Sequence, residues 1–189
     1  MMENKTTFAP LGVVIYRDSS VGDELLCGCA EYLQLLGHRL GGVVQSNVYR
    51  SGRLKCDMYL RDLLTCERIE ISNNRGNGAN GCRLDGSALA RACVLGSEAL
   101  RANIDLFVLN KFGKEESEGR GFRSVIAEAL IAGIPVVVGV SERNIASLTD
   151  FAGDAMKLVP AEHRAIANWG REAIGRRRAL FATVLGAES

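Results

Sequence analysis

The residues Leu11-Gly-Val-Val-Ile-Tyr16 form a short β-branched run of the kind found in buried parallel strands. A polar turn at 17–22 follows, and apolar residues then recur at spacings of three and four until Gly37, which predicts a helix. The next run, Gly41-Gly-Val-Val-Gln45, predicts a second strand. A strand–helix–strand unit of this length favours a parallel α/β sheet.

Downstream of this unit, the pattern changes and then returns. Two short strands joined by a tight polar turn at 65–67 are expected at 56–63 and 68–72, as an inserted antiparallel β-hairpin. The Asn/Gly-rich segment 73–82 predicts a loop, and Asp85 is a good N-cap for a helix to about residue 102. Strands are then expected at 105–110, 135–139 and 155–159, a charged loop at 111–121, and helices at 122–132, 142–151 and from 161 onward. We therefore predict an α/β fold with a doubly wound, mostly parallel sheet.

Composition restricts the function classes. The chain has 189 residues, 47% of them hydrophobic and 24% charged, which excludes intrinsic disorder. Lys and Arg number 23 against 22 Asp and Glu, so no global field attracts nucleic acid or a membrane surface, and any anion site must be local. No apolar run approaches the roughly 18 residues of a membrane span, and the first residues lack a secretory signal. We expect a cytoplasmic protein with neither membrane insertion nor nucleic-acid binding.

The turn at 17–24 stands where a Walker A phosphate loop would lie, between the first strand and its helix. Gly22 falls on the second glycine of that motif, but Asp23 replaces the lysine and Glu24 replaces the Ser or Thr that ligates Mg²⁺. At the end of the strand 105–110, where Walker B carries an acidic pair, the chain has Asn110 and Lys111. An ordinary phosphate cradle is therefore not expected. A capped helix start explains the turn equally well.

The charged loop after Asn110 is the second candidate site. Its cations are Lys111, Lys114, Arg120 and Arg123, with three glutamates between them. Together with the backbone N–H of Gly113, and with Arg83 if the preceding loop folds over the sheet edge, they could hold a phosphate or another oxyanion. The alternative is a salt-bridged surface loop. Lys111 is the foremost candidate because it lies next to the strand end.

Six cysteines show no CxxC spacing, and most are expected to be buried small hydrophobes. A thiol role, or ligation of a soft metal, is considered only for Cys56 and Cys82. No conventional metal site is predicted.

Three stretches resemble the hallmarks of a bacterial domain family of unknown function: Cys56-Asp-Met58, Gly81-Cys-Arg-Leu-Asp85 and Asn110-Lys-Phe-Gly-Lys-Glu-Glu-Ser-Glu-Gly-Arg-Gly-Phe122. Members of that family occur alone or attached to ATP-binding subunits of molybdate transporters, and they are distantly similar to the thermophilic nucleoside-triphosphatase family of P-loop proteins. The resemblance implies a P-loop-NTPase-like domain at 11–160, preceded by an extension at 1–10. From the sequence pattern, we expect an Arg-rich helix at 161–189 that packs on that domain or extends from it. The resemblance does not carry over the catalytic residues, since Asp23, Glu24, Asn110 and Lys111 depart from the nucleotidase pattern.

Three functions remain open at this point. The first is a degenerate P-loop-like binding or accessory protein, not an enzyme, for a nucleotide or a small oxyanion. The resemblance suggests molybdate and a transporter- or molybdoenzyme-related partner. The second is an active nucleoside triphosphatase or phosphotransferase, in which Lys111 or Lys114 replaces the Walker lysine and Asp18, Asp23 or Glu24 holds Mg²⁺ beside the nucleotide. The third is a protein-interaction module that docks through residues 171–189.

Overall fold

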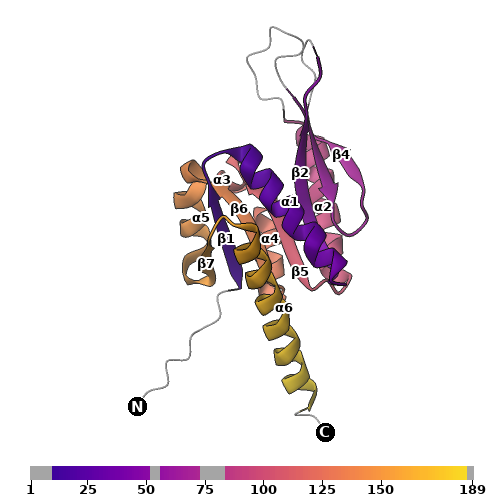
Figure 1. The fold of residues 1–189 in the computed structure, drawn as a ribbon, viewed down its shortest axis with the longest axis vertical. Helices are drawn as coiled ribbons and strands as arrows, with labels where there is room; N and C mark the ends of the chain where they lie inside the picture. The colour runs from indigo at the N-terminus through magenta and orange to yellow at the C-terminus, as the bar shows by residue number, and fades with distance from the viewer. Residues whose placement is uncertain (1–9, 52–55, 73–83, 187–189) are drawn as a thin grey trace.

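The computed structural model describes residues 10–51, 56–72 and 84–186, which form one seven-stranded sheet flanked by helices (Figure 1). The strands are β1 (Leu11–Tyr16), β2 (Leu40–Val48), β3 (Asp57–Asp62), β4 (Arg68–Glu70), β5 (Leu106–Phe112), β6 (Val136–Ser141) and β7 (Met156–Val159). The helices are α1 (Ser19–Leu35), α2 (Gly86–Arg101), α3 (Lys114–Ser117), α4 (Arg123–Ile131), α5 (Ile145–Ala152) and α6 (His163–Gly186), with short 3₁₀ turns at Glu142–Asn144 and Gly153–Ala155.

The sheet has the order β4-β3-β2-β5-β6-β1-β7. The five strands from β2 to β7 in this order pair in parallel, and β3 and β4 add an antiparallel hairpin beside β2. This confirms the predicted mostly parallel, doubly wound sheet and its inserted hairpin. One expectation needs correction: the predicted loop at 111–121 contains the end of β5 and the short helix α3.

Helices cover both faces of the sheet (Figure 1). The first face packs under α2, α4 and α5, and the second packs under α1 and α6. Successive strand residues contribute to opposite cores, as Val13 and Val14 do in β1, because side chains alternate along a strand. Burial on both faces explains why these strands are continuous apolar runs.

The last helix has two parts with different surroundings. Its first half packs on the sheet and on α1, and a Cβ added at Gly12 would lie only 2.8 Å from the ring of Trp169. Its second half leaves the body of the molecule (Figure 1), so that Leu180 and Phe181 are exposed. Among the described helices, none combines the length and the apolar content that a bilayer crossing requires.

A β-bulge near the end of β5 shapes the region that follows. Asn110 pairs with Gly139 of β6, but Phe112 pairs with the next residue, Val140, so Lys111 is an additional residue in the strand. A bulge of this kind redirects side chains and is common beside binding sites. As a result, Phe112 stays in the core under α2, and Lys111 lies beside it at the end of the strand.

The pairing of β2 with β5 depends on Gly42, which has φ of +92° and lies opposite Val108. An added Cβ would be 2.0 Å from the carbonyl oxygen of Val108. We expect Gly42→Ala to lower the free energy of unfolding by at least about 3 kcal/mol, because strain at positive φ and a backbone clash add together. Equilibrium unfolding in urea measures this change.

Gly86→Ala is the matched control, because no atom lies within 4 Å of its added Cβ and it begins α2. We expect this variant to equal the wild type or to gain up to about 1 kcal/mol. Equal stability of the two variants would contradict the account of Gly42.

Candidate functional site

The three segments at the carboxyl ends of β1, β5 and β6 meet, as expected for an open α/β sheet. Asn110 at the end of β5 hydrogen-bonds to Asp23 of α1. Arg17 forms an ion pair of 2.8 Å with Glu142, which follows β6. Several polar side chains from distant parts of the chain therefore converge at this edge.

The connection from β1 to α1 is too short for a phosphate loop. Only Arg17 and Asp18 separate Tyr16 from the first residue of the helix. The Asp18 carboxylate caps this helix by accepting hydrogen bonds from the backbone N–H of Ser20 at 2.8 Å and from its hydroxyl at 2.7 Å, and these bonds lower the pKa of Asp18. The Asp18 carboxylate of the protein itself thus occupies the N-terminus of α1.

Asp23, which stands at the Walker lysine position, is buried at 6% exposure. It accepts hydrogen bonds from the side-chain amides of Asn47, at 2.9 Å, and of Asn110, at 3.1 Å. Burial raises its pKa, while the charge of Lys111 and the two amides act in the opposite direction. Gln45 completes the set by donating to Asn47 at 3.0 Å. These four residues, Asp23, Gln45, Asn47 and Asn110, are called the Asp23 cluster below.

The ring of Tyr16 lies beside the Asp23 cluster and fills the space between α1 and β6. An added Cβ would be 2.4 Å from this ring at Gly22 and 3.0 Å from it at Gly139. Tyr16 is itself buried, and both burial and the nearby negative charge of Asp23 raise its pKa. Gly22 and Gly139 therefore leave the room that the ring of Tyr16 occupies.

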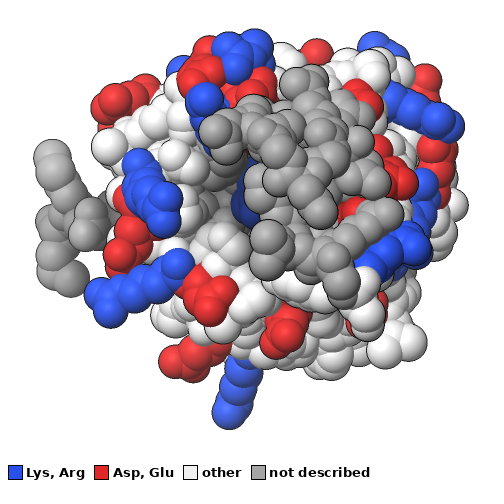
Figure 2. Space-filling view, turned by 90° about the horizontal axis from the view of Figure 1, so that it is seen from above, with Lys and Arg blue, Asp and Glu red and all other residues white. Residues whose placement is uncertain are grey.

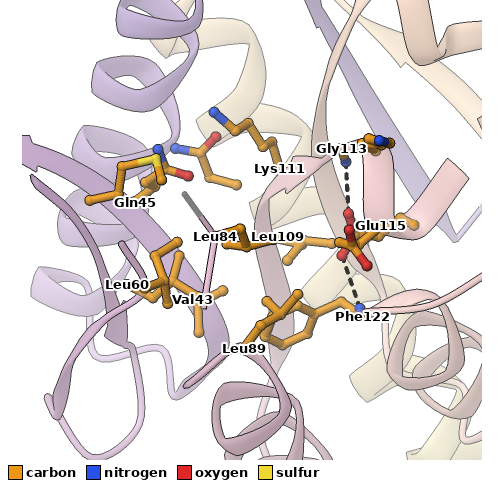
Figure 3. A pocket seen from close by; sticks show the side chains of 15 residues that line it. Val43, Gln45, Leu60, Leu84, Leu89, Leu109, Lys111, Gly113, Glu115 and Phe122 are labelled. Carbon is orange, nitrogen blue, oxygen red and sulfur yellow. Dashed lines mark hydrogen bonds between the residues drawn. The ribbon is translucent and has the colours of Figure 1, made fainter. Parts of the chain in front are cut away.

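A cavity of about 220 Å³ lies on the other face of β5, the face that α2 covers (Figure 3). Its apolar lining comes from Val43, Met58, Leu60, Ile71, Leu84, Leu89, Leu109 and Phe122. Its polar lining comes from Gln45, Asn110, Lys111, Gly113, Lys114, Glu115 and Glu116. Figure 3 shows Lys111 and Gln45 along one side of the cavity, with Val43, Leu60 and Leu89 opposite.

Lys111 is half-buried in this lining. Among the described residues it forms no ion pair within 4 Å, although its charge reaches Asp23. Its position in the bulge places it between the cavity and the Asp23 cluster. Lys111 is therefore a cation available to a ligand.

The rest of the charged loop is occupied by its own contacts. Glu116 is buried and accepts hydrogen bonds from the backbone N–H of Gly113 at 2.8 Å and of Phe122 at 3.0 Å. Arg120 pairs with Glu115 at 2.7 Å and also with Glu118. The Gly113 N–H, a candidate oxyanion donor, thus already binds a carboxylate, and this contact caps the N-terminus of α3.

The remaining candidate residues lie in different surroundings. Lys114 is exposed and lies 3.7 Å from Glu118, the Arg123 guanidinium stacks 4.6 Å over the ring of Phe151, and Glu24 is exposed. Gly22 donates its N–H within the helix start, to the carbonyl of Asp18. Arg83 and Cys82 fall outside the described residues.

Cys27, Cys29, Cys66 and Cys93 form no disulfide within the described ranges. Burial raises the pKa of Cys29 to about 11 and that of Cys93 to about 12, so both are protonated at neutral pH. Cys56 is half-buried. Within residues 10–51, 56–72 and 84–186, no three His, Cys, Asp or Glu side chains are grouped as a metal site requires.

Sequence reasoning missed Tyr16, Gln45, Asn47 and the inward position of Glu116. A signal existed for two of them: Gln45 and Asn47 are polar, two residues apart, and follow a buried apolar run. Residues at that spacing share a face of a strand. Nothing in the local sequence distinguishes Glu116 from its exposed neighbour Glu118.

Residues 11–169 match the family described as "Protein of unknown function (DUF2478)". The chain belongs to this family. It is also 35% identical over 170 residues to the "Molybdenum import ATP-binding protein ModC 2" of Bradyrhizobium diazoefficiens. That alignment covers 90% of this chain but only 19% of the relative, so the chain corresponds to about a fifth of that protein.

A solved structure has the same fold. It is the solution structure of a human cancer-related nucleoside triphosphatase, which superimposes with a TM-score of 0.59 over 89% of this chain and 97% of that one. The sequences are 14% identical, so this likeness concerns the fold. The family match and the relative confirm the sequence-based resemblance, and the solved structure confirms the P-loop-NTPase-like architecture.

The surroundings of Asp23 lead to a measurable titration. We expect its carboxyl to titrate above the ordinary pKa of 3.8, and Lys111→Met to raise this pKa further by removing a nearby positive charge. Lys157→Met is the control, because Lys157 is exposed and pairs with Gly12 at the opposite end of β1. NMR titration of the carboxyl ¹³C resonance measures the pKa. A value at or below 3.8 would contradict the burial argument.

The free energy of unfolding should change with pH as the Asp23 carboxyl titrates. A raised pKa means that the ionised carboxylate costs stability above the folded-state pKa, and this cost is relieved as the pH falls through that value toward 3.8. Asp23→Asn cannot ionise. We therefore expect its free energy of unfolding, relative to wild type, to be highest at neutral pH and to decline on acidification in urea unfolding. A constant difference would show that Asp23 has the same pKa in both states.

Proposed function

We propose that this protein is a P-loop-like binding protein without nucleotide hydrolysis, which holds a small anionic ligand at Lys111. One observation carries the proposal: the carboxylate of Asp23 replaces the phosphate-binding cation and is hydrogen-bonded to Asn110 at 3.1 Å. The residues at the two Walker positions thus bind each other.

Electrostatics at the start of α1 supports the loss of hydrolysis. Asp18 and Asp23 bring two carboxylates to the place where a triphosphate would need positive charge. The ring of Tyr16 fills the space beside Gly22. A nucleotide bound in the usual way would have to displace the ring and overcome the repulsion.

The anion site is proposed next to the Asp23 cluster, at Lys111, in the lining of the cavity under α2. Acidic and basic side chains are interspersed over the face of the molecule at the carboxyl ends of the strands (Figure 2). A mixed surface of this kind gives no broad attraction, so individual cations decide where an anion binds. Lys111 differs from Lys114 and Arg120 in having no carboxylate partner among the described residues.

The relative named a molybdenum import ATP-binding protein supports a role beside molybdenum transport. We therefore include molybdate among the anions to test, and propose that the chain acts in the cytoplasm as an accessory to such an ATP-binding subunit.

Calorimetric titration of the full chain with ATP or GTP, with and without Mg²⁺, and with phosphate, molybdate and short carboxylates tests the proposal. We expect the titration to show no Mg²⁺-dependent nucleotide binding. A phosphate-release assay with ATP should show only the background rate. Lys111→Met should weaken binding of any anion by about 10- to 100-fold, the usual effect of losing a hydrogen bond to a charged group.

Lys157→Met provides the matched control, since it removes the same charge from an exposed strand away from the cavity. Its affinities should equal those of the wild type. Mg²⁺-dependent turnover of ATP by wild type that Asp23→Asn abolishes would overturn the proposal and favour the active nucleoside triphosphatase.

A further inference from the structure

We propose that the ligand is an amphiphilic organic anion, a single carboxylate or comparable monoanion on a compact apolar body, with the body in the cavity under α2 and the charge at Lys111. This inference rests on the proposed function, because it names the class of ligand for the same cation. It also separates this ligand from nucleotides and from inorganic oxyanions.

The cavity wall indicates an apolar body. Side chains from β2, β3, β5 and α2 form it, among them Val43, Leu60, Leu89 and Leu109. A hydrated inorganic oxyanion would lose water contacts against these apolar side chains and gain no hydrogen bonds from them. An alkyl or aryl group gains free energy from the same transfer.

The polar side of the cavity indicates a single negative charge. Lys111 and Lys114 supply its cations, but Lys114 is exposed and lies 3.7 Å from Glu118. Glu115 and Glu116 also line the cavity. A polyanion would therefore be repelled by two carboxylates. It would be attracted by Lys111, the lining cation that has no carboxylate partner among the described residues.

The hydrogen bonds on the polar side of the cavity also favour a ligand with a single negative charge. The Gly113 N–H already donates to Glu116. The amide nitrogen of Gln45 donates to Asn47. Among the groups named here, the ligand's anionic group is thus left with the Lys111 ammonium as its charged donor and with the second N–H of the Gln45 amide.

The volume of the cavity restricts the class of ligand further. The volume of about 220 Å³ is roughly seven times the ~30 Å³ that a water molecule occupies in the liquid. An apolar body of roughly seven non-hydrogen atoms fills such a space. A nucleoside with its phosphates is several times larger.

The test uses the full chain and a series of probes: butanoate, hexanoate and octanoate, 1-octanol as the uncharged partner of octanoate, and inorganic phosphate and molybdate. Calorimetry should show affinity rising about fourfold per added CH₂ group until the cavity is full. Octanoate should bind at least about tenfold more tightly than 1-octanol. Lys111→Met should remove this difference between the two.

A cavity-filling variant tests the location. Leu89→Phe, in the wall, should weaken octanoate binding at least about tenfold, since it occupies the space of the apolar body. Leu180→Phe is the matched control on the exposed part of α6 and should leave binding unchanged. The chain-length series in wild type tests the same point without any substitution, should Leu89→Phe fail to fold.

The outcomes separate the two proposals. Phosphate or molybdate bound through Lys111 as tightly as octanoate would overturn the amphiphilic ligand and leave the proposed anion-binding function standing. Octanoate bound equally well by Lys111→Met would overturn the role of the charge. Mg²⁺-dependent ATP turnover by a protein that binds octanoate as described would overturn the proposed function and leave the ligand class standing. Absence of binding by every probe would overturn both.

Discussion

The buried carboxylate of Asp23 is the interaction on which the site depends. An isolated charge at 6% exposure is strongly unfavourable, so the groups around it must be arranged to compensate. The side-chain amides of Asn47 and Asn110 do this from β2 and β5, and Lys111 adds a positive charge nearby. Three elements are thereby tied together at the carboxyl edge of the sheet. The first turn of α1 is held down on the sheet, and the ring of Tyr16 is enclosed beneath it.

Two consecutive residues at the end of β5 connect the Asp23 cluster with the cavity under α2. Asn110 donates to Asp23 and also lines the cavity, and the extra residue of the bulge, Lys111, lines the cavity and stays within electrostatic reach of Asp23. A regular strand would send Lys111 to that same face but would turn Phe112 toward α1. The bulge keeps Phe112 in the core under α2 beside a cation, so the apolar wall and the charged edge of the cavity are neighbours.

Much of this architecture could be predicted from the sequence because it rests on periodicity. The runs at 11–16 and 135–139 are too short and too β-branched for helices, and the spacing up to Gly37 gives α1. The substitutions at Asp23 and Asn110 were also visible, but their hydrogen bond joins residues 87 positions apart and depends on the three-dimensional structure. The cavity could not be foreseen either, since its lining comes from several strands, from α2 and from the charged loop. For Glu116, the deciding factor is that two backbone N–H groups face it, which no local pattern reveals.

The two faces differ in what a ligand would have to displace. At the start of α1, an incoming anion would break the hydrogen bonds of a buried carboxylate, each worth about 1.5–3 kcal/mol, and would move an aromatic ring from between two glycines. It would then lie against Asp18 and Asp23. In the cavity under α2, the space is already open, its wall is apolar, and Lys111 has no carboxylate to give up among the described residues. A ligand pays no comparable cost there. In the proposed function, the Asp23–Asn110 pair thus occupies the place where a P-loop would bind phosphate, and the neighbouring lysine is the point where an anion gains most.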